Sequence, residues 1–463
     1  MSKQNKLVVS PEFSDTRNAW NMIVASLIVN IGFGLAIPLF TELGNDIDIG
    51  NLGFTRLQPA LAIGILLASF MIVRMITSYL IPDITDSAGR KNILIIGLIL
   101  YGIATFLIGF SRDFWVLLIL RGLEGGSTGI AFPISEALLV DSVAVSKRGE
   151  WMGKFFITFN AGFALGPAVG GVLYIIAEDF LGLNKVDAFI LPYGLTGLMG
   201  ITSALVVYLF VHDIFKPIKS KSMGKDDNDF RIKEMNVGKT YKVPFLSRLY
   251  AISVINGFGI GLISPIFTLY ALNEFKMSNN GVLLIFTVAG LVALPINWIS
   301  GKLSDKFNRV SLAMVGMAIG TVAFIGLGFL TSLILVIAFF VFRFMAMMFF
   351  VPAYRAFMAD IIPPIVRGRY FGRIQAIFNL GASSAPIIGG WMYDNLTEKT
   401  FTIFSNYKVF GAGFIFIFCA FISLLSTIII YFIYKAYNPE VHRFKNTIQM
   451  EQTESSISEP SII

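Results

Sequence analysis

The chain is poor in the residues on which soluble enzymes and secreted scaffolds depend. Its 463 residues include one cysteine and two histidines, and only 14% are charged. The single cysteine, Cys419, excludes a disulfide framework and a multi-cysteine metal site. Soluble domains carry about 25% charged residues, so the shortfall excludes an ordinary soluble enzyme and a disordered protein. We expect no catalytic residues, no metal site and no cofactor.

Hydrophobic residues are abundant instead, at 55% of the chain, and the mean hydropathy is +0.74. This amount suffices for about twelve helices of about 20 residues that each cross a membrane. The sequence therefore predicts an all-α membrane protein. The first apolar run lacks a small-residue cleavage site, so we expect it to remain as the first spanning helix. The predicted spans are 19–41, 58–81, 92–111, 114–140, 152–177, 188–212, 248–272, 281–301, 310–330, 333–359, 371–393 and 409–434.

The net charge of +7 is distributed unevenly between the predicted loops. Most of the 36 lysines and arginines fall in the loops that are cytoplasmic if the N-terminus is cytoplasmic. The positive-inside rule then favours both termini in the cytoplasm, with the protein in the plasma membrane. The basic excess thus reflects topology and does not indicate nucleic acid. We expect the lipid bilayer and a small-molecule substrate as partners, and a functional monomer.

The longest polar stretch divides the spans six and six. We predict a cytoplasmic N-terminal segment at 1–18, a six-helix bundle at 19–212, a cytoplasmic central loop at 213–247, a second bundle at 248–434 and a disordered cytoplasmic tail at 435–463.

The two predicted bundles repeat at a constant offset of 219 residues. The repeated positions are mainly charged, glycine or proline residues, where geometry or charge matters. They include Asp86/Asp305, Arg90/Arg309, Asp141/Asp360, Arg148/Arg367, Gly162/Gly381, Pro167/Pro386, Gly170/Gly389 and Gly171/Gly390. The repeat also predicts a break at Thr331-Ser332, which corresponds to Arg112-Asp113. Parallel six-helix repeats are a design of alternating-access transporters.

Three motifs carry a resemblance to the major facilitator superfamily. The loop after the second predicted helix of the second bundle has Gly301-x-Leu303-x-Asp305-x3-Arg309, and the first bundle keeps Asp86, Gly89, Arg90 and Lys91 with Pro82 in place of the first glycine. The fifth helix has Gly162-x3-Gly166-Pro167-x2-Gly170-Gly171, and the eleventh echoes it as Gly381-x3-Ala385-Pro386-x2-Gly389-Gly390. The fourth has Arg121-Gly-Leu-Glu124-Gly125. The chain resembles a twelve-helix member of this superfamily, with the glycine and arginine motifs similar to those of drug:proton antiporters.

The resemblance implies that the loop charges form a cytoplasmic gate. Ion pairs between the two bundles that exist in one state only would latch the cytoplasmic side. Alternatively, they are static salt bridges that fix helix ends. These residues are Asp86, Arg90, Asp141, Arg148, Asp305, Arg309, Asp360 and Arg367.

The glycine and proline motifs of the fifth and eleventh helices predict smooth stripes along which a neighbouring helix lies close. Sliding along the stripe would serve antiport, and ordinary small-residue packing is the other interpretation.

Ionisable residues inside predicted spans are candidate functional residues. Arg121 and Glu124 are three apart on one helix face and can pair. Glu124 would bind a proton or a cationic substrate, or the pair would only join helices. Arg343 occupies the repeat position of Glu124, and the resembled fold implies that both face the central cavity. Asn30 and Asn256, on the first and seventh helices, would bind substrate or each other.

The sequence thus predicts a secondary transporter that works by alternating access, with the proton as coupling ion. The favoured function is efflux of a hydrophobic or amphiphilic compound. Uptake of a small organic solute or anion, by proton symport or uniport, is an alternative. A non-transporting receptor on a transporter fold is an alternative of another class.

Overall fold

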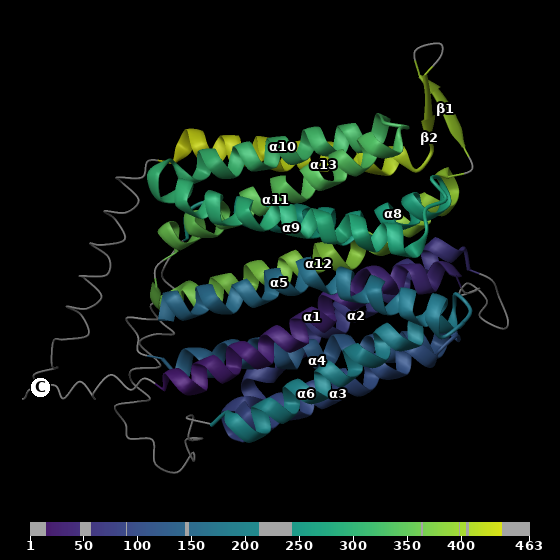
Figure 1. Cartoon of the computed structure of the whole chain (residues 1–463). Coiled ribbons are helices and arrows are strands. Elements are labelled where there is room, and N and C mark those ends of the chain that lie inside the picture. The colour runs from purple at the N-terminus through teal and green to yellow at the C-terminus, as the bar shows by residue number, and fades with distance from the viewer. Residues whose placement is uncertain are drawn as a thin grey trace, which may run out of the picture. The chain divides into compact units, whose positions relative to one another are not determined.

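A computed structural model describes residues 15–46, 57–88, 90–143, 148–212, 243–362, 364–397, 399–403 and 407–437 of the chain. Twelve long helices account for most of these residues (Figure 1). They are α1 (Thr16–Asp46), α2 (Pro59–Ala88), α3 (Arg90–Phe110), α4 (Phe114–Asp141), α5 (Arg148–Ile175), α6 (Ile190–Phe210), α8 (Leu246–Asn273), α9 (Asn279–Lys306), α10 (Arg309–Phe329), α11 (Leu333–Ile361), α12 (Pro364–Leu396) and α13 (Gly413–Ala436). Short helical turns, η2 (Ile176–Phe180) and η3 (Asp187–Phe189), lie between α5 and α6. The predicted all-α fold is confirmed.

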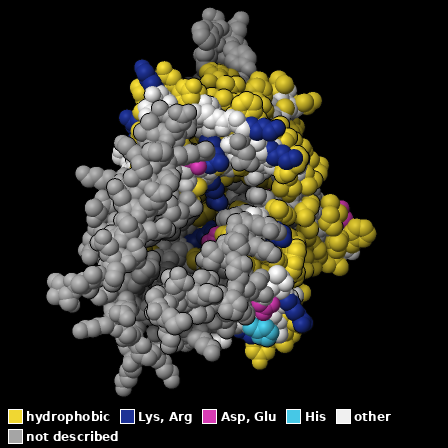
Figure 2. Space-filling model, turned by 90° about the vertical axis from the view of Figure 1, so that its left-hand side faces the viewer, with side chains coloured by type: hydrophobic (Ala, Val, Ile, Leu, Met, Phe, Trp, Pro, Cys, Tyr) yellow, Lys and Arg dark blue, Asp and Glu magenta, His cyan; other side chains and the backbone are white. Residues whose placement is uncertain are grey.

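The helices satisfy the requirements of a lipid environment. In lipid the backbone must satisfy its own hydrogen bonds, which a long helix does. Ten helices in the described part of the chain are long and apolar enough to cross a membrane. The two other long helices are α4, which carries Arg121 and Glu124, and α12. Large hydrophobic side chains such as Ile119, Leu284 and Ile334 are exposed, and hydrophobic side chains cover much of the described surface in Figure 2. Such a surface suits lipid and would aggregate in water.

The chain divides into two units. Unit 1 comprises Met1–Ile47 and Ser69–Ser220, and unit 2 comprises Asp48–Ala68 and Lys221–Ile463. The first ten residues of α2 therefore belong to unit 2, whereas the rest of the same helix belongs to unit 1. The predicted bundles at 19–212 and 248–434 stay a prediction.

Helix boundaries agree with some sequence expectations and correct others. The break predicted at Thr331-Ser332 is confirmed, because α10 ends at Phe329 and α11 begins at Leu333. The first helix is longer than the predicted span 19–41, since α1 runs to Asp46. The loop predicted between 393 and 409 contains a hairpin in which β1 (Thr400–Ile403) pairs antiparallel with β2 (Tyr407–Phe410). Apolarity alone did not reveal these strands, because each has only four residues.

In unit 1, the glycine stripe of α5 lets its backbone lie against that of α1. A Cβ atom added at Gly162 would run into the carbonyl oxygen of Asn30, and one added at Gly166 into the backbone of Leu35. Gly170 faces the side chains of Leu35 and Leu39. Both interpretations of this motif require these contacts, so a role in antiport stays a prediction.

In unit 2, the corresponding stripe of α12 packs against α8 in the same way. A Cβ atom at Gly381 would run into the carbonyl oxygen of Val254, and Gly389 faces Leu262. The opposite side of α12 meets the start of α2, since a Cβ atom at Gly390 would run into the carbonyl oxygen of Ala60.

An acidic side chain of α12 caps the first turn of α2 within unit 2. The backbone N–H groups of Leu61 and Ala60 donate to Oδ2 and Oδ1 of Asp394, at 2.7 and 3.2 Å. The first N–H groups of a helix lack partners inside the helix, so this carboxylate accepts their hydrogen bonds. Its negative charge also complements the positive end of the helix. Asp394 was not expected to have this role, because Ala60 and Asp394 are far apart in sequence.

We expect Gly162→Val to destabilise the protein by about 1–3 kcal/mol, because the added side chain overlaps the α1 backbone. Gly153→Val, on the same helix, is the matched control, since nothing lies within 4 Å of a Cβ atom there. The midpoint of thermal unfolding, followed by size-exclusion chromatography of heated samples, measures both. Equal midpoints for the two variants would contradict the close α1–α5 packing.

We expect Asp394→Ala to free the amides of Ala60 and Leu61 and to cost about 0.5–2 kcal/mol, as the loss of a helix cap does. Hydrogen exchange followed by mass spectrometry should show faster exchange at the start of α2. Asp113→Ala is the control, because Oδ1 of Asp113 accepts only the N–H of Val116 at the start of α4. Unchanged exchange at Ala60 and Leu61 would show that Asp394 does not cap α2.

Candidate functional site

The most deeply buried ion pair in the described residues lies in unit 1. The Nη1 atom of Arg121 donates to Oε2 of Glu124 at 2.5 Å, and the two side chains are 3% and 1% exposed. Both come from α4, one turn apart, as the sequence predicts. The other oxygen of Glu124, Oε1, and Nε of Arg121 have no hydrogen-bond partner within the described parts of the chain. The pair is therefore only half satisfied, which leaves an oxygen at which Glu124 can take up a proton.

Two aromatic rings hold the Arg121 guanidinium. Its Cζ atom lies 4.2 Å from the centre of the Phe40 ring of α1 and 4.8 Å from that of Phe70 of α2. Aromatic faces attract a desolvated cation and compensate part of the cost of burying it. Gly125 makes this approach possible, because a Cβ atom there would run into the carbonyl oxygen of Phe70.

Three further buried polar residues surround this pair, and the sequence analysis missed all of them. Tyr101 of α3 and Tyr193 of α6 lie within electrostatic range of both Arg121 and Glu124. Glu42 of α1 also lies within electrostatic range of the Tyr193 hydroxyl. All three side chains are at most 1% exposed. Glu42 was overlooked because the predicted span ended at residue 41, whereas α1 continues through it.

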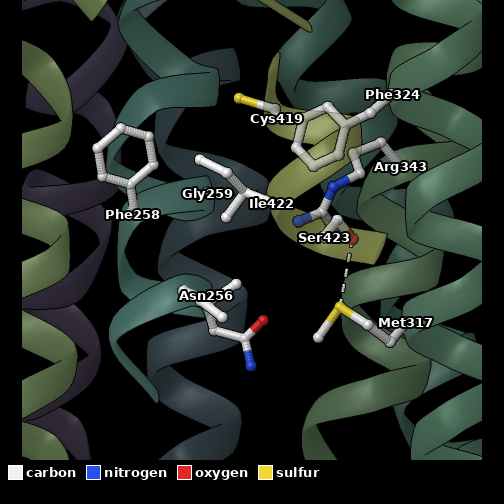
Figure 3. Close-up of a pocket in the computed structure, with 10 residues that line it drawn as sticks. Asn256, Phe258, Gly259, Met317, Phe324, Arg343, Cys419, Ile422 and Ser423 are labelled. Atoms are coloured by element: carbon white, nitrogen blue, oxygen red, sulfur yellow. Dashed lines mark hydrogen bonds between the residues drawn. The ribbon is translucent and has the colours of Figure 1, made fainter. Parts of the chain in front are cut away.

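Arg343 of α11 lies in a separate pocket of unit 2 (Figure 3). The side chain is 8% exposed, and its Cζ atom lies 4.6 Å from the centre of the Phe324 ring. Its Nε atom has no hydrogen-bond partner among the residues that the structure describes. The pocket residues are Ile255, Asn256, Phe258, Gly259, Met317, Phe324, Arg343, Cys419, Ile422 and Ser423. The expectation that Glu124 and Arg343 face one cavity stays a prediction, because they lie in different units.

The two candidate asparagines have different surroundings. Asn30 is buried, and its Nδ2 donates to the hydroxyl of Thr158 on α5 at 3.1 Å, so it joins α1 to α5. Asn256 lines the Arg343 pocket. The expectation that the two asparagines bind substrate or each other stays a prediction, because Asn30 lies in unit 1 and Asn256 in unit 2.

One predicted gate pair is described in full. Nη1 of Arg309 lies 2.7 Å from Oδ1 of Asp360, and also donates to the carbonyl oxygen of Ala356. This pair joins the start of α10 to the end of α11 inside unit 2, as a salt bridge that fixes helix ends would. Arg90 is described as a partly buried residue at the start of α3. The side chains of Asp86, Asp141, Arg148, Asp305 and Arg367 lie outside the described residues.

The sequence matches the family model of the Major Facilitator Superfamily over residues 22–247 and 249–460. The chain belongs to the Major Facilitator Superfamily. It is accordingly a multi-pass membrane transporter and not an enzyme.

Two curated relatives are similar over most of their length. The quinolone resistance protein NorA of Staphylococcus aureus is 24% identical over 369 residues, which cover 79% of this chain and 87% of that protein. An uncharacterised MFS-type transporter of Methanocaldococcus jannaschii is 22% identical, covering 82% of this chain and 92% of that one.

Solved transporter structures share the fold. A D-xylose-proton symporter has a TM-score of 0.70 at 16% identity and covers 89% of this chain and 97% of that one. The human organic anion transporter MFSD10 has a TM-score of 0.61 at 17% identity, covering 91% and 100%. At these identities the likeness concerns the fold alone.

We expect Arg121→Met to be strongly destabilising, because it leaves Glu124 buried without its partner; such losses are about 3–5 kcal/mol. The double variant Arg121→Met/Glu124→Met should recover much of the loss, since both charges are gone. Arg373→Met is the matched control: Arg373 is an exposed arginine on α12, so its loss should change stability by about 0.5 kcal/mol or less. Thermal midpoints measure all variants. A double variant as unstable as the sum of the two single ones would contradict a coupled pair.

Proposed function

We propose that this chain exports a hydrophobic or amphiphilic small molecule in exchange for protons, and that Glu124 is the proton-binding carboxylate. The observation that carries the proposal is the buried, half-satisfied carboxylate of Glu124. A carboxylate at this depth is costly when it is charged, so its proton affinity depends on Arg121 beside it. A substrate or a movement that alters this contact would thereby change whether Glu124 holds a proton.

The relatives support export. NorA is named for quinolone resistance, and removing a drug from the cell is one way in which a membrane transporter confers resistance. The glycine and arginine motifs resemble those of drug:proton antiporters. The proton is the coupling ion in this proposal, and no cofactor takes part.

The proposed cycle is alternating access in the cell membrane, with both termini in the cytoplasm and the monomer as the working unit. In this cycle the loop charges, among them Arg309 and Asp360, hold the cytoplasmic side closed while the substrate site faces outward. Asn30 contributes by fixing α1 to α5.

Proton movement in sealed proteoliposomes tests the proposal. Internal pH is followed with a dye while lipophilic cations, neutral amphiphiles and organic anions are added across an imposed pH gradient. We expect at least one amphiphile to evoke proton flux in the wild type. Glu124→Gln should abolish this flux and leave equilibrium binding of the same compound intact, since glutamine cannot carry the proton.

Glu178→Gln is the matched control, because Glu178 lies on η2 and is not a member of the buried Arg121–Glu124 pair, so the variant should behave as the wild type. Proton flux that survives in Glu124→Gln would rule out Glu124 as the carrier. A wild type that moves no protons with any compound would overturn proton coupling itself.

A further inference from the structure

Unit 2 buries an arginine that has no counter-charge in the described part of the chain. Of the arginines described, Arg121 and Arg343 are less than a tenth exposed. Glu124 neutralises Arg121. Arg343 has no ion pair and donates no hydrogen bond to any other described residue. A buried charge is costly unless it is paired and hydrogen-bonded, so the arrangement around Arg343 is incomplete.

The repeat makes the contrast sharper. Arg343 occupies the position in unit 2 that corresponds, at the offset of 219 residues, to the carboxylate Glu124 in unit 1. The position that corresponds to Arg121 is Phe340, a buried aromatic residue. Unit 1 therefore has a matched pair of charges at this level of the fold, and unit 2 has a lone cation.

The surroundings of Arg343 hold its guanidinium in place without neutralising it. The Phe324 ring lies against the cation at 4.6 Å. Gly320 of α10 offers a flat surface, since a Cβ atom there would lie 3.8 Å from Cζ and from Nη1 of Arg343. A ring face supplies only part of the stabilisation that an anion would give. The guanidinium is thus positioned, buried and still able to form charge-assisted hydrogen bonds.

The pocket beside it combines apolar and polar walls. Figure 3 shows Arg343, Asn256 and Ser423 around a common space, and Phe258 of α8 and Ile422 of α13 belong to its apolar lining. The hydroxyl of Ser423 interacts with the Met317 sulfur at 3.4 Å. The cavity beside Arg343 has a volume of about 10 Å³, room for about one water-sized group. That is far less than the about 300–1,000 Å³ of a whole ligand site, so the walls must move apart before more than one oxygen atom of an anionic group can enter.

We infer that this pocket is a subsite for the anionic group of an amphiphilic substrate, with Arg343 as the anion-binding residue and Asn256 as a polar neighbour. The ligand class is an aromatic or aliphatic compound with a carboxylate, sulfonate or phosphate group. The inference rests on the proposed function and narrows the substrate to compounds that bear a negative charge.

Equilibrium binding to the full chain in lipid nanodiscs tests this without a proton gradient. The probes are 2-naphthoate, 2-naphthamide and 2-naphthylmethylammonium, which share a ring system and differ in charge. We expect wild type to bind 2-naphthoate about tenfold or more tightly than the amide, as a hydrogen bond to a charged group gives. Arg343→Gln should lose this preference while its affinity for the amide stays within about twofold.

Arg343→Lys keeps the charge and should retain part of the preference, which guards against a folding defect in Arg343→Gln. Arg373→Gln, an exposed arginine on α12, is the matched control and should bind as the wild type does. Equal affinity of wild type for the acid and the amide would overturn the inference. So would an acid preference that persists in Arg343→Gln, or the absence of binding by all three probes.

The anion can come from a free compound or from a lipid headgroup. Nanodiscs of phosphatidylcholine alone and with added phosphatidylglycerol distinguish the two sources. Competition by the anionic lipid would assign the site to lipid headgroups. Unchanged binding of 2-naphthoate would assign it to free amphiphiles. Because no transport is measured, an acid preference without proton flux would contradict the proposed antiport and leave the subsite standing. Proton flux without an acid preference would contradict the anion subsite and leave the proposed antiport standing.

Discussion

Close contact between helix backbones is the interaction on which this structure depends. Lipid supplies no hydrophobic drive for helices to associate, so they adhere through van der Waals contact and a few polar bonds. Gly162 and Gly166 let α5 lie on the backbone of α1, and Gly381 does the same for α12 on α8. Gly125 brings α4 onto Phe70, which in turn places an aromatic ring against Arg121. The glycine positions therefore determine where the buried charges lie.

The two buried arginines, Arg121 and Arg343, differ in how far the fold compensates their charge. Arg121 has a carboxylate and two rings, so its burial is largely compensated within unit 1. Arg343 has one ring and a pocket. In the proposed cycle, Glu124 would respond to a proton and Arg343 to the charge of the ligand. Asp394 shows a third use of charge, as it caps a helix that lies partly in each unit.

Sequence reasoning succeeded where the signal was local or repeated. Apolar runs gave the helices, and the offset of 219 residues separated α10 from α11 in a nearly continuous run. The spacing of Arg121 and Glu124 correctly predicted their pairing, because residues three apart share a helix face. Sequence reasoning failed where partners are distant in the chain, since Tyr101, Tyr193 and Glu42 come from three other helices. It also missed the hairpin at 400–410, because the strands are too short for an apolar pattern to reveal them.

The amino-acid sequence by itself determined that the protein is a helical membrane transporter with a repeated six-helix plan, because hydropathy, charge placement and spacing are properties of the chain alone. Only the tertiary structure decided which charges are paired. Whether a charge is paired depends on its burial and its neighbours, and these depend on the packing of helices that are distant in sequence. Glu124 and Arg343 occupy equivalent repeat positions, yet Glu124 has a partner in its own helix and Arg343 faces a pocket.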